Sequence, residues 1–460
     1  MKKINDLKWM MLFTMSLVTF SCKKFLDIDP PKTNLVDKTV FQNNDMATAA
    51  ITNVYSTMGA SNSYASGGNQ SITCVAGLSS DELISYNNIS LTEFYINQIT
   101  PINPLVLNLY AGPYLSIFKV NSILEGLKAP NGITPPIKAQ LQGEAYFIRA
   151  FNYFYLVNLF GPVPLQLSSD YRLTRVESRA TVDEVYNQII TDLKIAENLL
   201  TDQYITTERV RPNLAAVQAL LARIYLYRQD WANAEKYSTL VISKSTIYSL
   251  VPLDNIFLKN SEETIWQLFP LPNSNTEDGA NFILTAPPTQ VSLSRAFVDN
   301  AFEPNDKRKI SWVRSFTNNT VTYYYPFKYK VKSSTTVTEY SMILRLAEQY
   351  LIRAEARTEE NNLENAVSDL DKIRDRAGLP LIKDINPGIN KLDLLNAIQK
   401  ERRVELFSEW GHRWFDLKRT EIANNILGQL KSQWRTTDVL YPIPYNETNR
   451  NPNILQNNGY

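Results

Sequence analysis

The stretch "GEAYFIRAFNYFYLVNLFGPVPL", Gly143 to Leu165, decides the fold. Apolar and aromatic side chains fill nearly every position from Tyr146 to Phe160 and cover nearly the whole circumference of a helix. Gly161 and Pro162 end that helix, because glycine suits a helix C-terminus and proline cannot continue one. A helix that is apolar all round has to be buried among other helices. We therefore predict a mainly α protein with this helix at its centre.

Two later segments have the same pattern, namely "LLARIYLYRQDWANAEKYSTLVI" at Leu220 to Ile242 and "YLIRAEARTEENNLENAVSDLDKIR" at Tyr350 to Arg374. Each predicts a helix, a polar turn and a second helix, with one alanine in each helix at the same spacing. Small residues at such positions let paired helices approach closely, as in tetratricopeptide-like hairpins. The alanines are Ala222 and Ala234 in the first segment, and Ala354 and Ala366 in the second.

The chain between these hairpins, from Ser249 to Tyr340, is rich in Pro, Asn, Thr and aromatic residues. That composition predicts loops and short strands. The stretch "GASNSYASGGNQS", Gly59 to Ser71, also predicts a loop. We expect one domain over residues 22–460: a tetratricopeptide-like scaffold with a large irregular insertion, and with loop-rich ligand-binding parts near residues 61–100 and 249–340.

The N-terminus predicts export. Three lysines among the first eight residues precede a mostly apolar run from Trp9 to Phe20, which is too short to cross a bilayer but suits a signal peptide. Ser21 and Cys22 follow, and a small residue before cysteine is typical of a bacterial lipoprotein signal. We predict that residues 1–21 are removed and that Cys22 is acylated as a lipid anchor.

The composition excludes several classes of function. The chain has 47 basic and 46 acidic side chains, so its charge gives no case for nucleic acid as a partner. His412 is the single histidine, which argues against histidine-rich metal sites, and we expect no metal and no cofactor. Cys74 is the second of two cysteines; it is expected to be a small buried residue, and no disulfide framework is available.

The segment "ERRVELFSEWGHRWFDLKR", Glu401 to Arg419, spaces its first three glutamates four residues apart. A catalytic carboxylate pair is one interpretation. Interleaved arginines favour another, an ion-pair network on the surface and at the end of a helix. Within this segment we expect the His412 side chain to be packed and hydrogen-bonded and not catalytic. We therefore predict that the protein is not an enzyme; a glycoside hydrolase, which would need two opposed acids in a groove, stays open as an alternative.

Aromatic residues in the loop-like regions are the candidates for ligand contact. Flat rings beside Asn, Gln and Asp suit sugars, whose C–H faces stack while their hydroxyls form hydrogen bonds, and similar surfaces bind peptides. Packing beneath the loops is the alternative for each ring. The candidate ligand-binding residues are Tyr64, Asn69, Asp81, Tyr86, Asn87, Tyr95, Trp312 and Tyr323.

Motifs along nearly the whole chain resemble the SusD/RagB family of outer-membrane lipoproteins. Besides the segments quoted above, they are "CKKFLD" after the signal, "YLSIFKVNSILEGL" at Tyr114 to Leu127, "NDKR" at Asn305 to Arg308, "LRLAEQYLIRAEA" at Leu344 to Ala356, "IRDRAGLP" at Ile373 to Pro380 and the C-terminal "YPIPYNETNRNPNILQNNGY".

This resemblance implies a lipid-anchored protein on the outside of the outer membrane. Such a protein would capture an oligosaccharide, or in the alternative a peptide, and deliver it to a SusC-like TonB-dependent transporter without catalysing a reaction. The shared motifs fall in the scaffold, so no ligand-binding residue is carried over from the family. A scaffold that binds only other proteins remains a further alternative.

Overall fold

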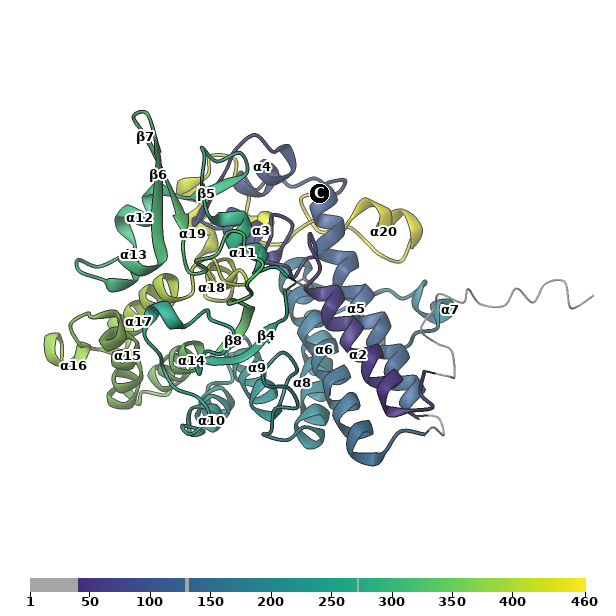
Figure 1. Ribbon diagram of the computed structural model, residues 1–460. Helices are drawn as coiled ribbons and strands as arrows, with labels where there is room; N and C mark the ends of the chain where they lie inside the picture. Colours follow the sequence, from purple (N-terminus) through teal and green to yellow (C-terminus); the bar gives the residue numbers. More distant parts are fainter. Residues whose placement is uncertain (1–39, 129–131, 271–272) are drawn as a thin grey trace, which may run out of the picture.

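The computed structural model describes residues 40–128, 132–270 and 273–460, which form a helical body with a small sheet region standing on it (Figure 1). The predicted signal peptide and Cys22 lie outside the described residues. None of the helices in the described part of the chain is long and apolar enough to cross a bilayer.

The predicted central helix is confirmed as α6 (Pro135–Phe160). Every residue from Phe147 to Val157 is buried, because α2 (Asn44–Met58), α5 (Pro104–Lys128) and α8 (Val182–Leu199) pack around it. Gly161 follows the helix with φ +71°, a left-handed conformation that favours glycine, and its N–H donates to the Val157 carbonyl. Burying each large apolar side chain in this way contributes about 1.5–3 kcal/mol.

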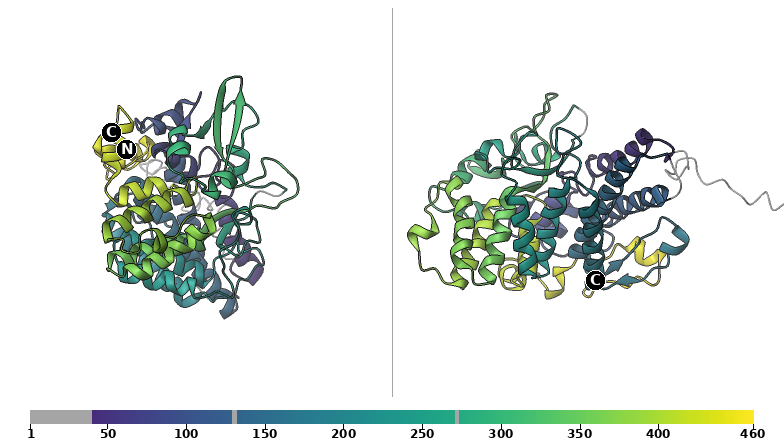
Figure 2. Two further views of the ribbon diagram at one scale, coloured as in Figure 1. Left: turned by 90° about the vertical axis from the view of Figure 1, so that its left-hand side faces the viewer. Right: turned by 90° about the horizontal axis from the view of Figure 1, so that it is seen from below.

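Both predicted hairpins are present, as α9 (Leu214–Tyr227) with α10 (Trp231–Ile242) and α14 (Leu346–Glu359) with α15 (Leu363–Ala377). Helix α10 also packs on α14, so the hairpins lie side by side, and α17 (Lys391–Glu405) extends the row. The view from below shows this row of helices running from light green to teal (Figure 2). The four hairpin alanines are all fully buried, as their spacing predicted.

The irregular insertion contributes strands to two sheets. Strand β4 (Thr264–Leu268) pairs with β8 (Ser341–Arg345) against the scaffold. A four-stranded sheet has the order β1-β5-β7-β6, formed by β1 (Leu83–Ser85), β5 (Val291–Leu293), β7 (Val321–Pro326) and β6 (Val313–Asn318). Because β1 comes from the first loop-rich region and the other three strands from the second, this sheet joins the two.

Several short elements complete the fold. The insertion contains three six-residue helices that the composition did not predict, because so few residues show no helical period: α11 (Glu277–Phe282), α12 (Arg295–Asn300) and α13 (Lys307–Trp312). The others are α3 (Ile72–Ser79), α4 (Ile89–Tyr95), α7 (Tyr171–Thr174), α16 (Ile382–Ile385), α18 (His412–Arg419), α19 (Ala423–Leu430), α20 (Tyr445–Arg450), β2 (Val163–Pro164), β3 (Arg179–Ala180) and the 3₁₀ turns η2 (Leu253–Asn255) and η3 (Thr436–Val439).

The glutamates of the Glu401–Arg419 segment form ion pairs with arginines, but in the core and not on a helix surface. The Arg345 guanidinium is 2% exposed, and its Nη1 lies 2.9 Å from Glu263 Oε1 and 2.6 Å from Glu405 Oε1. The expected surface location was wrong because partners such as Arg345 come from β8, distant in sequence. His412 is buried nearby, and burial together with the arginine charges lowers its pKa well below the usual value.

Candidate ligand-binding site

The β1–β5 pair brings the two loop-rich regions together at one end of the sheet. Ser85 lies opposite Val291, and just beyond the strands the backbone N–H of Tyr86 donates to the Gln290 carbonyl over 2.8 Å. The sheet stands beside α4 at the top of the molecule (Figure 1). Side chains that are about 200 residues apart in the sequence therefore share one surface.

Tyr86 and Tyr323 form what we call the aromatic corner. Their ring centroids lie 5.9 Å apart, with 73° between the ring planes. The Tyr86 hydroxyl shares a 2.9 Å hydrogen bond with Ser292 Oγ, which fixes the ring on the sheet. Phe316 lies opposite Tyr323 in the β6–β7 register and hence on the same face. All three rings are partly exposed, so they offer apolar faces to solvent.

Amide groups surround the aromatic corner. Asn88 Nδ2 donates to Gln290 Oε1 over 2.8 Å, while Asn88 Oδ1 accepts from the Leu91 N–H and caps α4. Asn87 is exposed between Tyr86 and Asn88. Asn87 is one of the predicted residues, whereas Asn88 and Gln290 are not, because their pairing depends on the β1–β5 register. An Asn before an apolar run is a helix-cap signal, and it could have placed Asn88.

A polar pocket of about 400 Å³ adjoins this surface through Gln290. Asn69, Glu277 and Lys332 also line it. Asn69 Oδ1 is buried and has no hydrogen-bond partner among the described residues. A buried amide oxygen without a partner costs free energy, and a hydroxyl group of a ligand could satisfy it.

Two predicted rings are instead part of the core. The Tyr64 hydroxyl donates to Asn152 Oδ1 of α6 over 2.5 Å. The Trp312 side chain is fully buried, and its Nε1–H donates to the Leu253 carbonyl over 3.2 Å. Neither ring offers a face to solvent, so we leave both out of the proposed site. A missing helical pattern did not mean exposure, because these rings attach irregular chain to the scaffold.

Asp81 and Tyr95, the remaining candidates, line a different pocket at the opposite end of β1. Asp81 accepts hydrogen bonds from Arg413 and Arg403. Although burial opposes ionisation, these two arginines hold the pKa of Asp81 below its usual value. Apart from the two core rings, the predicted residues thus lie on two separate surfaces.

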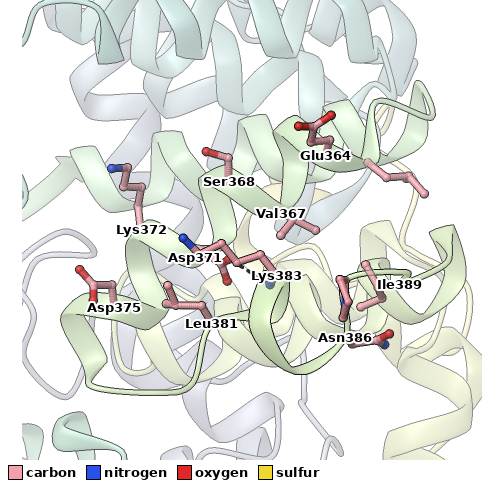
Figure 3. Close-up of a pocket in the computed structure, with 12 residues that line it drawn as sticks. Glu364, Val367, Ser368, Asp371, Lys372, Asp375, Leu381, Lys383, Asn386 and Ile389 are labelled. Atoms are coloured by element: carbon pink, nitrogen blue, oxygen red, sulfur yellow. Dashed lines mark hydrogen bonds between the residues drawn. The ribbon is translucent and has the colours of Figure 1, made fainter.

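A larger pocket, of about 710 Å³, lies between α15 and residues 381–389 (Figure 3). Val367 and Asp371 point from the helix toward that segment. Asp371 is already engaged, since its carboxylate accepts from the backbone N–H groups of Ile382 and Lys383. None of the described residues that line this larger pocket is aromatic. The pocket therefore lacks a stacking surface, and the aromatic corner remains the better candidate.

Within residues 40–128, 132–270 and 273–460, no group of three or more His, Cys, Asp or Glu side chains is arranged to hold a metal ion. Burial raises the pKa of the Cys74 thiol to about 12, so this cysteine is protonated at neutral pH.

A helical-repeat scaffold that carries exposed rings and amides on an inserted sheet has the architecture of a binding protein. A family model described as "Starch-binding associating with outer membrane" matches residues 24–226, and a model described as "SusD family" matches residues 308–460. The chain belongs to the SusD/RagB family, as its sequence motifs indicated.

Relatives named SusD-like align over much of the chain, and solved structures share its fold. SusD-like protein P25 from Formosa agariphila is 24% identical and aligns over 96% of this chain and 97% of its own. SusD-like protein P2 from the same organism is 28% identical and aligns over 69% of this chain and 73% of its own. A SusD superfamily structure from Bacteroides vulgatus superposes with a TM-score of 0.79 at 20% identity. The match covers 91% of this chain and 99% of that structure. The structure of a laminarin binding SusD-like protein superposes with a TM-score of 0.76 at 24% identity. This match covers 91% of this chain and 100% of that structure.

Proposed function

We propose that this protein captures an oligosaccharide at the aromatic corner and delivers it to a SusC-like TonB-dependent transporter. It does so at the exterior of the outer membrane, where Cys22 anchors it by acyl chains. The observation that carries the proposal is the pair of partly exposed rings of Tyr86 and Tyr323 beside the amides of Asn87 and Asn88.

The geometry of the aromatic corner suits a sugar chain. Rings inclined at 73° can contact two faces of a bent oligosaccharide, because aromatic rings supply large apolar surfaces on which the C–H faces of sugars pack. Hydrogen bonds from the nearby amides add about 1 kcal/mol each.

The polar pocket supports capture without catalysis. A glycoside hydrolase needs two carboxyl groups on either side of the scissile bond. Among the described residues that line the polar pocket, Glu277 is the single carboxylate. Measurable cleavage of an oligosaccharide by the purified protein, abolished by Glu277→Gln, would contradict this part of the proposal.

The family comparisons support both the ligand class and the location. One family description names starch binding and association with the outer membrane, and one solved structure of the same fold is titled as laminarin binding. A peptide is the second candidate ligand, because exposed tyrosines and amides also bind peptide chains. Both ligands would leave the transporter partnership unchanged.

Calorimetry with pooled oligosaccharides and pooled peptides separates these candidates. We expect saturable heat when the wild type is titrated with oligosaccharides. A Tyr171→Ala control variant, which removes an exposed ring outside the aromatic corner, should bind them like the wild type. Binding to peptides alone would replace the glycan by a peptide. Purification from membranes tests the partner: an outer-membrane barrel should accompany the protein, whereas soluble proteins alone would favour a pure interaction scaffold.

A further inference from the structure

The pocket that contains Asp81 and Tyr95 has a volume of about 390 Å³ and lies where β1 begins and β5 ends. The Ser294 N–H donates to the Glu82 carbonyl over 2.7 Å and so joins the two strands at this end. We call it the arginine pocket. Its polar lining residues are Ser80, Asp81, Tyr95, Ser294, Asn300, Arg403, Arg413, Gln429 and Lys431.

Positive charge exceeds negative charge in the arginine pocket. Arg413 binds Asp81 through two hydrogen bonds of 2.8 and 2.9 Å, and Arg403 adds a third of 2.7 Å, so two guanidinium groups share one carboxylate. Lys431 also lines the pocket and donates to backbone carbonyls, but burial lowers its pKa to about 7, so the excess of positive charge rests on the two arginines. Glu82, the neighbour of Asp81 in the chain, is buried. Burial and the Asp81 charge raise the pKa of Glu82 to about 8, so this carboxyl group is mostly protonated at neutral pH.

The guanidinium end of Arg403 is the part that a ligand can reach. Its Nη2 donates to Asp81, whereas its Nε is buried without a hydrogen-bond partner among the described residues. Its guanidinium carbon lies 5.5 Å from the Phe297 ring centroid, which fixes the group against an apolar surface, and its side chain stays 25% exposed. Guanidinium N–H groups in such a setting bind carboxylate and sulfate oxygens well.

A ring that could support a saccharide lies in the same pocket. The Tyr95 ring is partly exposed, and Lys431 Nζ lies 5.8 Å from its centroid. A volume of about 390 Å³ is within the usual size of small-molecule sites, which combine an apolar face with a few placed polar groups. The pocket thus offers a ring face and an excess of donors side by side.

We propose that the arginine pocket is a second ligand site, which binds the carboxylate or sulfate group of an acidic saccharide. Arg403 donates to the anionic group, and Tyr95 contacts the sugar ring. The assignment to a saccharide rests on the proposed glycan capture. Because the pocket and the aromatic corner lie at opposite ends of β1, an acidic oligosaccharide is the ligand class that would use both.

The test is calorimetric titration with galacturonate, galactose 6-sulfate and neutral galactose at constant ionic strength. We expect at least one acidic sugar to bind about tenfold or more tightly than galactose; the carboxylate and sulfate arms show which group is preferred. Arg403→Gln should abolish that preference. Arg295→Gln, which removes an exposed arginine of α12 outside the pocket lining, should keep it.

Two results would overturn the proposal: equal affinity for all three sugars, or an unchanged acid preference in Arg403→Gln. Asp81 keeps Arg413 as its partner in that variant, and an unchanged melting temperature will confirm that it folds. A variant with Tyr86→Ala and Tyr323→Ala separates this site from the aromatic corner. It should lose neutral oligosaccharides but keep the preference for acidic monosaccharides, so either proposal can fail alone.

Discussion

Arg345 stabilises a core that contains many charges. Its guanidinium donates to Glu263, Glu405 and Glu409 and to the Glu405 carbonyl, all in buried surroundings. Arg376 and Lys328 pair with the same carboxylates. Removing one member of a buried ion pair leaves charge without compensation, which costs more than the pair itself contributes.

Arg345→Met should therefore lower the free energy of unfolding by about 3–5 kcal/mol. Denaturant unfolding followed by circular dichroism measures this change. Arg295→Met, at an exposed ion pair, is the matched control and should cost less than about 1 kcal/mol. A similarly small loss for Arg345→Met would show that the network contributes little.

Glu82 predicts a dependence of stability on pH. Burial raises its pKa to about 8, above the ordinary 4.5, so between these values the folded protein keeps a proton that the unfolded chain releases. Stability attributable to Glu82 then falls as the pH rises through this window, by at most about 1.4 kcal/mol per pH unit.

Glu82→Gln should remove that fall, so its stability relative to wild type should increase from pH 5 to pH 8 and then level off. Thermal unfolding at several pH values checks this expectation. Glu364→Gln, at an exposed position, controls for general charge effects. A constant difference between Glu82→Gln and wild type across the range would contradict the assignment.

Single residues also show how far the sequence predicted the site. Tyr86, Tyr323, Tyr64 and Trp312 look alike in the sequence, as rings in irregular segments. Only the structure separates the first two, which are partly exposed on the sheet, from the last two, which donate hydrogen bonds inside the core. The difference lies in partners such as Asn152, distant in the chain, and no local pattern encodes them.

At the scale of elements, the hairpins depend on close helix contact. Ala234 of α10 is fully buried, whereas Ala232 on the same helix is exposed. Ala234→Leu should destabilise the protein by about 1–3 kcal/mol, because the added methyl groups force the helices apart. Ala232→Leu should change stability by less than about 0.5 kcal/mol in the same denaturant titration. Equal effects would mean that the hairpin is not closely packed there.

The sequence predicted long helices well and the sheet poorly. The 23 residues of Gly143–Leu165 have enough apolar positions to reveal burial on all sides. Strand β1 has three residues, and its partner β5 lies about 200 residues away, so neither periodicity nor a turn signal links them. Residues 249–340 contain the expected short strands, whereas residues 61–100 also form the helices α3 and α4, and the joining of the two regions into one surface could not be predicted from composition.

At the scale of the whole molecule, the proposed function requires attachment to the outer membrane. Cys22→Ala should release the protein from the membrane fraction without unfolding it, because stable anchoring depends on acyl chains. Fractionation of cells with detection of the protein measures this directly. Retention of the variant in the membrane fraction, with acylation and processing unchanged, would show that another residue anchors the chain.

The central claim is that the aromatic corner binds the ligand. Calorimetry with an oligosaccharide that binds the wild type should show about a fivefold or greater loss of affinity in a variant with both Tyr86→Ala and Tyr323→Ala, since the apolar contacts of two partly exposed rings together contribute about 1–3 kcal/mol. A control variant with Tyr171→Ala and Tyr445→Ala, two exposed rings elsewhere, should bind like the wild type. Unchanged affinity in the first variant would contradict the proposed function.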